Sequence, residues 1–285
     1  MTEALEAGHL LPRAEIGDTF LYRGKDTMLS RAAWIDGMGL AVKTATVFPE
    51  NPAAGLPMIG GGVSVFCDNG VLEALVDFHL VTKWKTAGDS LLAARKLARP
   101  DSRRILIVGA GTVGASLFEA YSAGFPGAEF TIWNRNADRA EAFADARPGM
   151  QVANSLAEAV QDADIVTSAT MTTEPILQGV WLRPGQHIDL IGAYRPDMRE
   201  ADDAALHRAR IFVDSYATTL DHIGEMKIPL ASGTITRSDV LADYYDIASG
   251  AFARNSEDEI TLFKNGGGAH LDLMTCRYVL DRVPV

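Results

Sequence analysis

Three glycines between a predicted strand and a predicted helix have the spacing that most clearly indicates a chemistry. Gly109, Gly111 and Gly114 follow the apolar run 105–108 and open a helical pattern. In a G-x-G-x-x-G turn the glycines allow a tight bend, a close approach of the backbone to a pyrophosphate, and close packing of helix on strand. We therefore predict a dinucleotide site, with a plain glycine-rich turn as the alternative. The residues expected at the phosphates are Gly109, Gly111, Thr112, Val113 and Gly114.

The end of the next predicted strand, 130–133, indicates which dinucleotide is bound. A site for NAD usually has an acidic residue there to hold the ribose 2′-hydroxyl. This chain has Asn134 and Arg135 instead, and a guanidinium can bind the 2′-phosphate that a carboxylate would repel. We therefore expect NADPH as the cofactor. The alternative is that Arg135 is a solvated loop residue and that NADH is also accepted.

The elements that must position this turn fall into two parts of the chain. The first hundred residues are predicted to be mostly strands, including 39–48 and a hairpin around Asn69-Gly70. A helix over 77–98 and a hinge at 100–102 follow. From there strands and helices alternate, which predicts a parallel sheet and an α/β fold.

Composition argues against several classes of partner. The chain of 285 residues has 26 basic and 37 acidic residues, which give a formal charge of −11. Binding to nucleic acid or to an anionic membrane is therefore not expected. The sequence lacks a long apolar run and an evident signal peptide, and its two cysteines, Cys67 and Cys276, lack metal-ligand or redox spacing. We expect a cytoplasmic protein with reduced thiols and no bound metal.

Several further motifs occur in an order that one family shares. They are Val42-Lys43 before FPENPAAGLP, Lys85-Thr86-Ala87, VGAGTVG, TEPIL, GAYRPDMRE and ITLFKNGGGAHLDL. The chain resembles the ornithine cyclodeaminase/mu-crystallin family of NAD(P)-dependent proteins that act on imines, over about residues 11–280. The resemblance implies a Rossmann dinucleotide-binding domain at 100–255 and a strand-rich substrate-binding domain built from 1–99 and 256–285. In the family the strand-rich domain forms a homodimer.

The resemblance also implies that the cations Arg13, Lys43 and Lys85 bind a substrate α-carboxylate. The sequence supports Lys43 independently, because it lies in an apolar strand and a buried ammonium needs a partner. That partner is a bound carboxylate or, alternatively, an internal salt bridge. Lys85 stands where the family usually has arginine, so it keeps the charge but loses the bidentate geometry; the alternative for it is a solvated helix cation. Arg13 is assigned only after a two-residue shift of the alignment.

For the cofactor, the resemblance implies contacts from two strand ends and from a loop near the C-terminus. Thr170 and Thr172 end one predicted strand near the nicotinamide ribose, and Gly192 ends the next one near the ring. Ordinary strand-end hydrogen bonding is the alternative for the threonines. The loop implied to lie over the nicotinamide contains Lys264, Asn265 and Gly266, where the family more often has Lys-Ser-Val-Gly.

One position discriminates between the reactions of the family. Ornithine cyclodeaminases have an aspartate there that activates the substrate amine, whereas this chain has Tyr194. Without that general base, the resemblance favours an NAD(P)-dependent oxidoreductase with Lys43 as its catalytic residue. We expect NADPH-dependent reduction of a cyclic 2-imino acid, Δ1-pyrroline-2-carboxylate or Δ1-piperideine-2-carboxylate, to L-proline or L-pipecolate, a reaction of proline metabolism. The alternatives are an ornithine cyclodeaminase, an alanine dehydrogenase, and a non-catalytic NADPH-binding protein of the crystallin kind.

Overall fold

The computed structural model describes residues 1–283 and divides the chain into two compact units. The central unit is Thr86–Gly266, and the other consists of Met1–Lys85 together with the segment that begins at Gly267. We call the latter the two-ended unit, because both ends of the chain contribute to it. The boundaries expected from the sequence, 99/100 and 255/256, differ from these. The reason is that the second half of helix α2 (Phe78–Leu97) and strand β13 (Ile260–Lys264) belong to the central unit.

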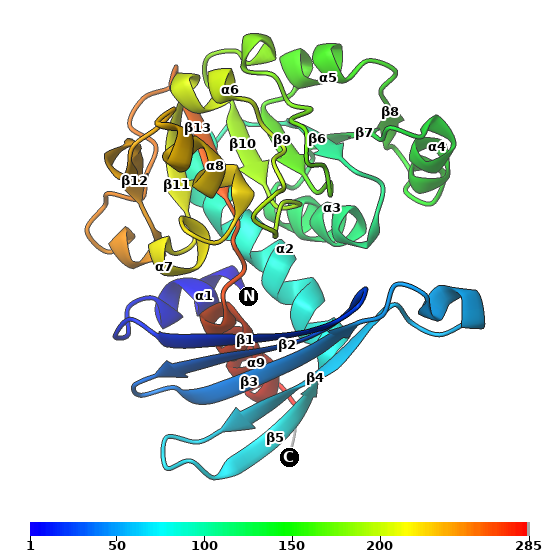
Figure 1. Cartoon of the computed structure of the whole chain (residues 1–285). Coiled ribbons are helices and arrows are strands. Elements are labelled where there is room, and N and C mark those ends of the chain that lie inside the picture. Colours follow the sequence, from blue (N-terminus) through cyan, green and yellow to red (C-terminus); the bar gives the residue numbers. More distant parts are fainter. Residues whose placement is uncertain (284–285) are drawn as a thin grey trace. The chain divides into compact units, whose positions relative to one another are not determined.

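Five antiparallel strands form the sheet of the two-ended unit, in the order β1-β2-β3-β4-β5 (Figure 1). Their bounds are Glu15–Arg23, Asp26–Ile35, Gly39–Val47, Ile59–Phe66 and Leu72–Asp77. Helix α9 (Ala269–Leu280) packs against β2 and β3, and α1 (Thr2–Gly8) packs against α9. Strands β1 and β2 pair along nine successive residues, from Glu15 with Trp34 to Arg23 with Asp26.

Strand β3 alternates between its two faces. Ala41, Lys43 and Ala45 are buried, whereas Val42 and Thr44 between them are half-buried. Because successive side chains of a strand point to opposite sides of the sheet, the buried set lies on one face, and α9 packs on this strand. Lys43 is thus a cation on the buried face of an otherwise apolar strand.

The central unit contains an eight-stranded sheet in the order β12-β11-β13-β10-β9-β6-β7-β8, and its pairings within the described residues are parallel. Besides β13, the strands are β6 Arg104–Val108, β7 Glu129–Trp133, β8 Gln151–Val152, β9 Ile165–Ser168, β10 His187–Leu190, β11 Ala209–Val213 and β12 Val240–Ala242. The α-helices that follow α2 here are α3 Thr112–Gly124, α4 Ala137–Asp145, α5 Leu156–Asp162, α6 Asp203–Arg208, α7 Tyr216–Thr219 and α8 Gly224–Ser232. This is a Rossmann-like arrangement, so the predicted fold class is confirmed.

The side chains of β6 show that both faces of this sheet are covered. Leu106 and Val108 belong to one buried apolar cluster, and Ile105 and Ile107 belong to another. A strand that is apolar on both faces is typical of a parallel sheet between two helix layers. The apolar run that precedes the glycine turn therefore contributes to the buried clusters on both faces of the sheet.

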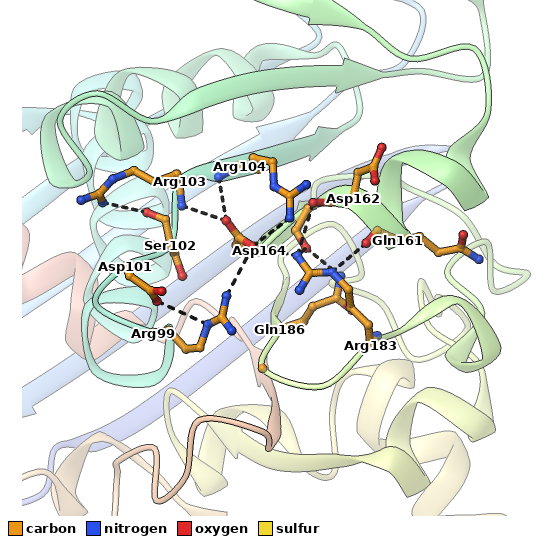
Figure 2. A network of polar contacts seen from close by, with 12 residues as sticks. Arg99, Asp101, Ser102, Arg103, Arg104, Gln161, Asp162, Asp164, Arg183 and Gln186 are labelled. Carbon is orange, nitrogen blue, oxygen red and sulfur yellow. Dashed lines mark hydrogen bonds and ion pairs between the residues drawn. The ribbon is translucent and has the colours of Figure 1, made fainter.

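Asp164 ties together the amino-terminal edge of the sheet (Figure 2). Its Oδ2 atom accepts the backbone N–H groups of Arg103 and Arg104 at 2.9 and 3.0 Å, and its Oδ1 atom lies 2.7 Å from the guanidinium of Arg183. Burial alone would raise the pKa of the Asp164 carboxyl, but these donors lower the pKa to about 2. The carboxylate therefore stays charged at neutral pH and connects the starts of β6, β9 and β10.

Three further findings concern residues 1–283 as a whole. None of the helices in this range is long and apolar enough to cross a membrane. Within the same range, no group of three or more His, Cys, Asp or Glu side chains is arranged to hold a metal ion. The thiols of Cys67 and Cys276 are free.

Candidate active site

Two of the three glycines in the turn after β6 are required by the protein itself. Gly109 has a φ of +114°, and a Cβ atom there would lie 2.8 Å from the carbonyl oxygen of Ala169. A Cβ atom on Gly114 would lie 2.2 Å from the carbonyl oxygen of Gly109. The first glycine therefore permits the tight turn and the third permits close packing of α3 on that turn, as the spacing predicted.

Gly111 is different, because the protein leaves room for a side chain there. A Cβ atom at this position would meet none of the described atoms within 4 Å. Gly111 is the exposed N-cap of α3, and Thr112 and Val113 in the first turn are exposed as well. The N–H groups of a helix start lack partners within the helix and favour an anion. The fold itself therefore does not require a glycine here, and the backbone at Gly111 is open to close approach by a group from outside the chain.

The tip of β7 holds the glycine turn in place. Asn134 Oδ1 accepts the N–H of Ala110 at 3.2 Å, and Asn134 Nδ2 donates to the carbonyl oxygen of Asn136 at 3.0 Å. The neighbouring Arg135 is exposed, and its guanidinium has no hydrogen bond or ion pair to the described residues 1–283. The side chain of Asn134 thus shapes the turn, while that of Arg135 is available to an anion.

The ends of β9 and β10 lie against each other at the carboxyl-terminal edge of the sheet. A Cβ atom on Gly192 would lie 1.9 Å from the carbonyl oxygen of Thr170, so a larger residue does not fit there. The Thr170 hydroxyl donates to Glu200 Oε1 at 2.7 Å. The hydroxyl of Thr172, in an exposed segment, donates to the carbonyl oxygen of Glu174 at 2.6 Å. The structure therefore brings Thr170 and Gly192 together and leaves Thr172 outside that contact.

The residues after β13 are buried in the central unit. Lys264 is fully buried, and its ammonium donates to a backbone carbonyl of β10 at 2.9 Å. Asn265 Nδ2 donates to the hydroxyl of Ser90 at 3.1 Å, and a Cβ atom on Gly266 would lie 2.1 Å from the hydroxyl of Thr219. Because protein encloses these side chains, the geometry favours a supporting role for Lys264 and Asn265 over the direct nicotinamide contact that the resemblance implied.

In the two-ended unit, the two lysines expected at a substrate carboxylate share one buried carboxylate of the protein. Nζ of Lys43 lies 3.0 Å from Asp272 Oδ1 on α9, and Nζ of Lys85 lies 3.9 Å from the same oxygen. Lys85 also donates to the carbonyl oxygen of Gly267 at 3.0 Å. Both lysine side chains are 8% exposed and that of Asp272 is 1% exposed. The internal salt bridge considered for Lys43 is therefore present, and Lys85 is not a solvated cation.

The cluster of Lys43, Lys85 and Asp272 carries a net positive charge. Burial alone would raise the pKa of the Asp272 carboxyl, but the charges of Lys43 and Lys85 hold that pKa below its usual value. The carboxylate is therefore ionised beside two ammonium groups. Two ammoniums that converge in a buried place favour an anionic ligand, and a carboxylate is the anion that they already bind here.

Further cationic groups lie around this cluster. Arg31 on β2 donates to the carbonyl oxygen of Gly267 at 2.9 Å, the acceptor that Lys85 also uses. Burial lowers the pKa of His270 well below its usual value, and nearby cations that include Lys85, Arg31 and Arg13 add to the effect, so this imidazole is neutral at pH 7. Arg13 lies in the segment between α1 and β1 and is exposed. It is therefore the most exposed of the three expected carboxylate-binding residues.

Similarity to known proteins extends over most of the chain. Residues 29–284 match the profile described as ornithine cyclodeaminase/mu-crystallin family. The chain belongs to the ornithine cyclodeaminase/mu-crystallin family. The resemblance inferred from the motifs is thereby confirmed, including its Rossmann domain and its antiparallel sheet.

Relatives within the ornithine cyclodeaminase/mu-crystallin family include reductases and a dehydrogenase. The chain is 55% identical to a Δ1-pyrroline-2-carboxylate reductase of Paracoccus denitrificans, over 97% of this chain and 90% of the relative. The solved Δ1-pyrroline-2-carboxylate reductase of Thermococcus litoralis, in complex with NADH and L-proline, has a TM-score of 0.90 at 28% identity and covers 98% of this chain and 91% of its own. An archaeal alanine dehydrogenase dimer with bound NAD has a TM-score of 0.90 at 26% identity, with coverages of 98% and 89%.

Where the cyclodeaminases of the family carry an aspartate, the structure has an exposed tyrosine. Tyr194 follows β10, and it is 60% exposed. The nearby carboxylate of Asp197 is bound by Arg195, whose Nε atom lies 2.9 Å from Asp197 Oδ1. The residue expected in place of the cyclodeaminase aspartate is therefore an exposed phenol.

Two acidic residues of the candidate site were not anticipated from the sequence. Asp272 lies within the ITLFKNGGGAHLDL motif, but it is 229 residues from Lys43, and only the fold shows that the two meet. Glu200 ends the GAYRPDMRE motif and binds the strand-end residues Thr170 and Gly192. In both cases the available signal was an acidic residue inside a family motif, and the motif did not identify its partner.

Proposed function

We propose that the protein is an NADPH-dependent imino acid reductase. Its substrate is a cyclic 2-imino acid, Δ1-pyrroline-2-carboxylate or Δ1-piperideine-2-carboxylate, and its product is L-proline or L-pipecolate. The observation that carries the proposal is the convergence of the buried ammoniums of Lys43 and Lys85 on one carboxylate oxygen. The 55% identity to a Δ1-pyrroline-2-carboxylate reductase supports the substrate class.

The residues of the chain mainly bind and orient in this reaction. A bound nicotinamide supplies the hydride. Lys43 and Lys85 hold the substrate carboxylate and thereby fix the adjacent C=N carbon for attack. A protonated ring imine is already electrophilic, so the site needs no strong acid. Lys43 is the proposed catalytic residue because its ammonium touches the substrate.

The proposed cofactor contacts lie along the carboxyl-terminal edge of the central sheet. The turn of Gly109, Gly111 and Gly114, with the exposed N–H groups at the start of α3, receives the pyrophosphate. Thr170 and Gly192 lie at the nicotinamide half. Arg135 binds the 2′-phosphate, and NADH binds more weakly because it offers no phosphate to this guanidinium.

Replacing Arg135 by alanine should weaken NADPH binding by about 1–3 kcal/mol, the range for a hydrogen bond to a charged group, and leave NADH binding nearly unchanged. Fluorescence titration of both cofactors measures the two affinities. Arg237→Ala is a matched control, because Arg237 is another exposed arginine of the central unit and pairs with Asp221. Equal losses for NADPH and NADH would contradict the assignment of Arg135.

A substrate panel tests the proposed function against its alternatives. The loss of NADPH absorbance is measured with both cyclic imines and with pyruvate plus ammonia, and NAD reduction is measured with L-alanine. With L-ornithine the release of ammonia and the formation of proline are measured, because cyclodeamination leaves no net reduced cofactor. We expect the cyclic imines to be the best substrates. Activity confined to L-ornithine would favour a cyclodeaminase, and activity confined to L-alanine or pyruvate would favour alanine dehydrogenase. NADPH binding without any turnover would favour a non-catalytic, crystallin-like protein.

We also propose that the protein is a homodimer formed through the two-ended unit. Trp34, Leu40 and Phe66 are paired across neighbouring strands on the sheet face opposite to Lys43. Leu75 is 75% exposed, and residues 56–59, which lead into β4, are exposed as well. Monomers rarely expose a large contiguous apolar surface, and the archaeal alanine dehydrogenase relative is a dimer.

Light scattering at micromolar concentration should give the mass of a dimer. Leu75→Lys should raise the dimer dissociation constant at least about tenfold, because it places a charge in the apolar contact. Val180→Lys is the matched control, since Val180 is an apolar residue of the central unit with a similar exposure, 71% against 75%. A monomeric parent protein would refute the proposal, as would an equal effect of the two substitutions.

The proposed division of labour follows the two units. The central unit binds the cofactor, and the two-ended unit binds the imino acid and the partner protomer.

The free thiols of Cys67 and Cys276 support a cytoplasmic location, where thiols stay reduced. The partners in this proposal are a small imino or amino acid and a second copy of the chain. The net charge of −11 argues against nucleic acid and anionic membranes as partners.

A further inference from the structure

The buried carboxylate of Glu200 accepts hydrogen bonds from both loops that follow β9 and β10. Its Oε1 atom accepts hydrogen bonds from the Ser168 hydroxyl at 2.6 Å, the Thr170 N–H at 2.8 Å and the Thr170 hydroxyl at 2.7 Å. Its Oε2 atom accepts the N–H groups of Gly192 at 2.6 Å and Ala193 at 3.3 Å. Each carboxylate oxygen thus serves a different loop, so the side chain joins the two loops at a fixed distance.

The two loops have little freedom to compensate for a change at this point. The last paired residues of the strands are Ser168 and Leu190. Just beyond them, the backbone at Gly192 is so close to Thr170 that a single Cβ atom would lie 1.9 Å from the carbonyl oxygen. The contact therefore depends on the spacing of the loops, and Glu200 accepts the backbone N–H groups on both sides of it.

Two ionisable residues, Lys264 and Glu225, lie around the completely buried side chain of Glu200. Lys264 is fully buried; burial lowers the pKa of its ammonium, and the charge of Glu200 counteracts this effect. Glu225 accepts the backbone N–H of Glu200 at 2.7 Å and that of Ala201 at 3.1 Å, and so fixes the backbone that carries the Glu200 side chain. Burial, followed by the charge of Glu200, raises the pKa of Glu225 to about 7. Lys264 and Glu225 therefore support Glu200 from two other elements, β13 and α8.

We propose that Glu200 is a positioning residue for the reaction: it holds Thr170 and Gly192 at the spacing that the nicotinamide half of the cofactor requires. The inference rests on the proposed NADPH-dependent function and extends it to a residue that touches neither cofactor nor substrate. The adenosine half is assigned to the start of α3 and to Arg135. The five hydrogen bonds that Glu200 accepts come from the last residue of β9 and from the loops after β9 and β10, so the two halves of the cofactor should respond differently to its loss.

An amide cannot replace this carboxylate. Backbone N–H groups approach both oxygens, from Thr170 on one side and from Gly192 and Ala193 on the other. A glutamine side chain has one accepting oxygen and one donating NH2 group, so in either orientation the NH2 group faces a backbone N–H. A buried N–H without an acceptor is unfavourable, so in Glu200→Gln one loop must move away from the other.

Glu200→Gln is compared with Asp164→Asn, a matched control on the opposite edge of the same sheet. Asp164 is also a largely buried carboxylate that accepts two backbone N–H groups, but it lies at the starts of the strands (Figure 2). Calorimetric titrations measure the affinity for NADPH and for 2′-phospho-ADP-ribose, which lacks the nicotinamide. Steady-state kinetics measure kcat for reduction of Δ1-pyrroline-2-carboxylate, at a temperature below the thermal midpoints of both variants.

We expect Glu200→Gln to lower kcat by about 10- to 100-fold, the effect of a small misplacement of reacting groups. NADPH should bind less tightly, whereas the affinity for 2′-phospho-ADP-ribose should stay within about twofold of the parent, as for a distant site. Asp164→Asn should keep the parent kcat and both affinities, even where its thermal midpoint is lower. Glu200→Asp, which retains the charge and withdraws it by one methylene, replaces Glu200→Gln in the same comparison if that variant does not fold.

Three results would overturn the proposal. The first is an equal loss of affinity for NADPH and for 2′-phospho-ADP-ribose in Glu200→Gln, and the second is no loss of either affinity or kcat in that variant. The third is an equal fall of kcat in Asp164→Asn, which would reduce the role of Glu200 to general stability. Failure of the proposed function is distinguishable from both, because a parent protein that reduces no imine still yields the two binding titrations.

Discussion

Replacing Lys43 by methionine should lower the rate of imine reduction by at least about two orders of magnitude, the low end for loss of a positioned catalytic group. Methionine keeps most of the volume and removes the ammonium that we propose holds the substrate carboxylate. The affinity for NADPH should not change, because the proposed cofactor contacts belong to the central unit. Folding should survive, since Asp272 retains Lys85 as an ionic neighbour, with 3.9 Å between Nζ and Oδ1.

The measurement is kcat and KM for Δ1-pyrroline-2-carboxylate, together with an NADPH titration. Lys85→Met should cost less than Lys43→Met, because Lys85 is farther from the shared oxygen, at 3.9 Å against 3.0 Å. Lys25→Met is the negative control, since Lys25 lies in the same unit with a side chain 78% exposed and pairs with Glu50 on the surface. A Lys43→Met protein that binds NADPH and turns over at the parent rate would show that the proposed carboxylate site is wrong.

Replacing Asp272 by asparagine should lower the free energy of unfolding by about 3–5 kcal/mol, the cost of removing one partner of a buried ion pair. Asparagine has nearly the same shape, so the loss comes from charge: the ammoniums of Lys43 and Lys85 remain buried without this carboxylate. Denaturant unfolding followed by circular dichroism measures the change. A variant as stable as the parent would mean that the pair contributes little and that another group compensates the lysines.

A double-mutant cycle separates the charge effect from the loss of a hydrogen bond. Lys43→Met with Asp272→Asn leaves the same charge on these three positions as in the parent, because one ammonium and one carboxylate are removed together. The double variant should therefore be destabilised by less than the sum of the two single variants, by at least about 1 kcal/mol for groups in direct contact. Additive losses would indicate that the two side chains act independently despite their 3.0 Å separation.

The sequence predicted the parts of the fold that rest on local patterns. The G-x-G-x-x-G turn between β6 and α3 was predicted because this glycine spacing allows a tight turn and close packing of the helix. Gly109 and Gly114 do lie so close to backbone oxygens that a Cβ atom would not fit. The hairpin of β4 and β5 followed from its Asn-Gly turn. The boundary between the two units near residue 266 could not be predicted from the sequence, because it depends on the pairing of β13 with β10 and β11, strands far from it in sequence.

Single residues of the candidate site could be predicted from their local sequence, but their partners could not. Lys43 was singled out because a cation in an apolar strand needs a partner, yet its partner Asp272 is 229 residues away. Lys264 was expected at the nicotinamide, but its position in the sequence does not reveal that the chain encloses it completely. Glu200 was part of a recognised motif, and its role depends on which loops meet at its two oxygens, which only the folded sheet determines.

The two-ended construction has a consequence for synthesis. Lys43 leaves the ribosome 229 residues before Asp272. At the usual rate of translation, about 5–20 residues per second, this separation corresponds to roughly 10–50 seconds. Throughout that interval the nascent sheet of β1 to β5 lacks α9, and the central sheet lacks β13 between β10 and β11. Neither unit can therefore be completed before residues 260–280 emerge.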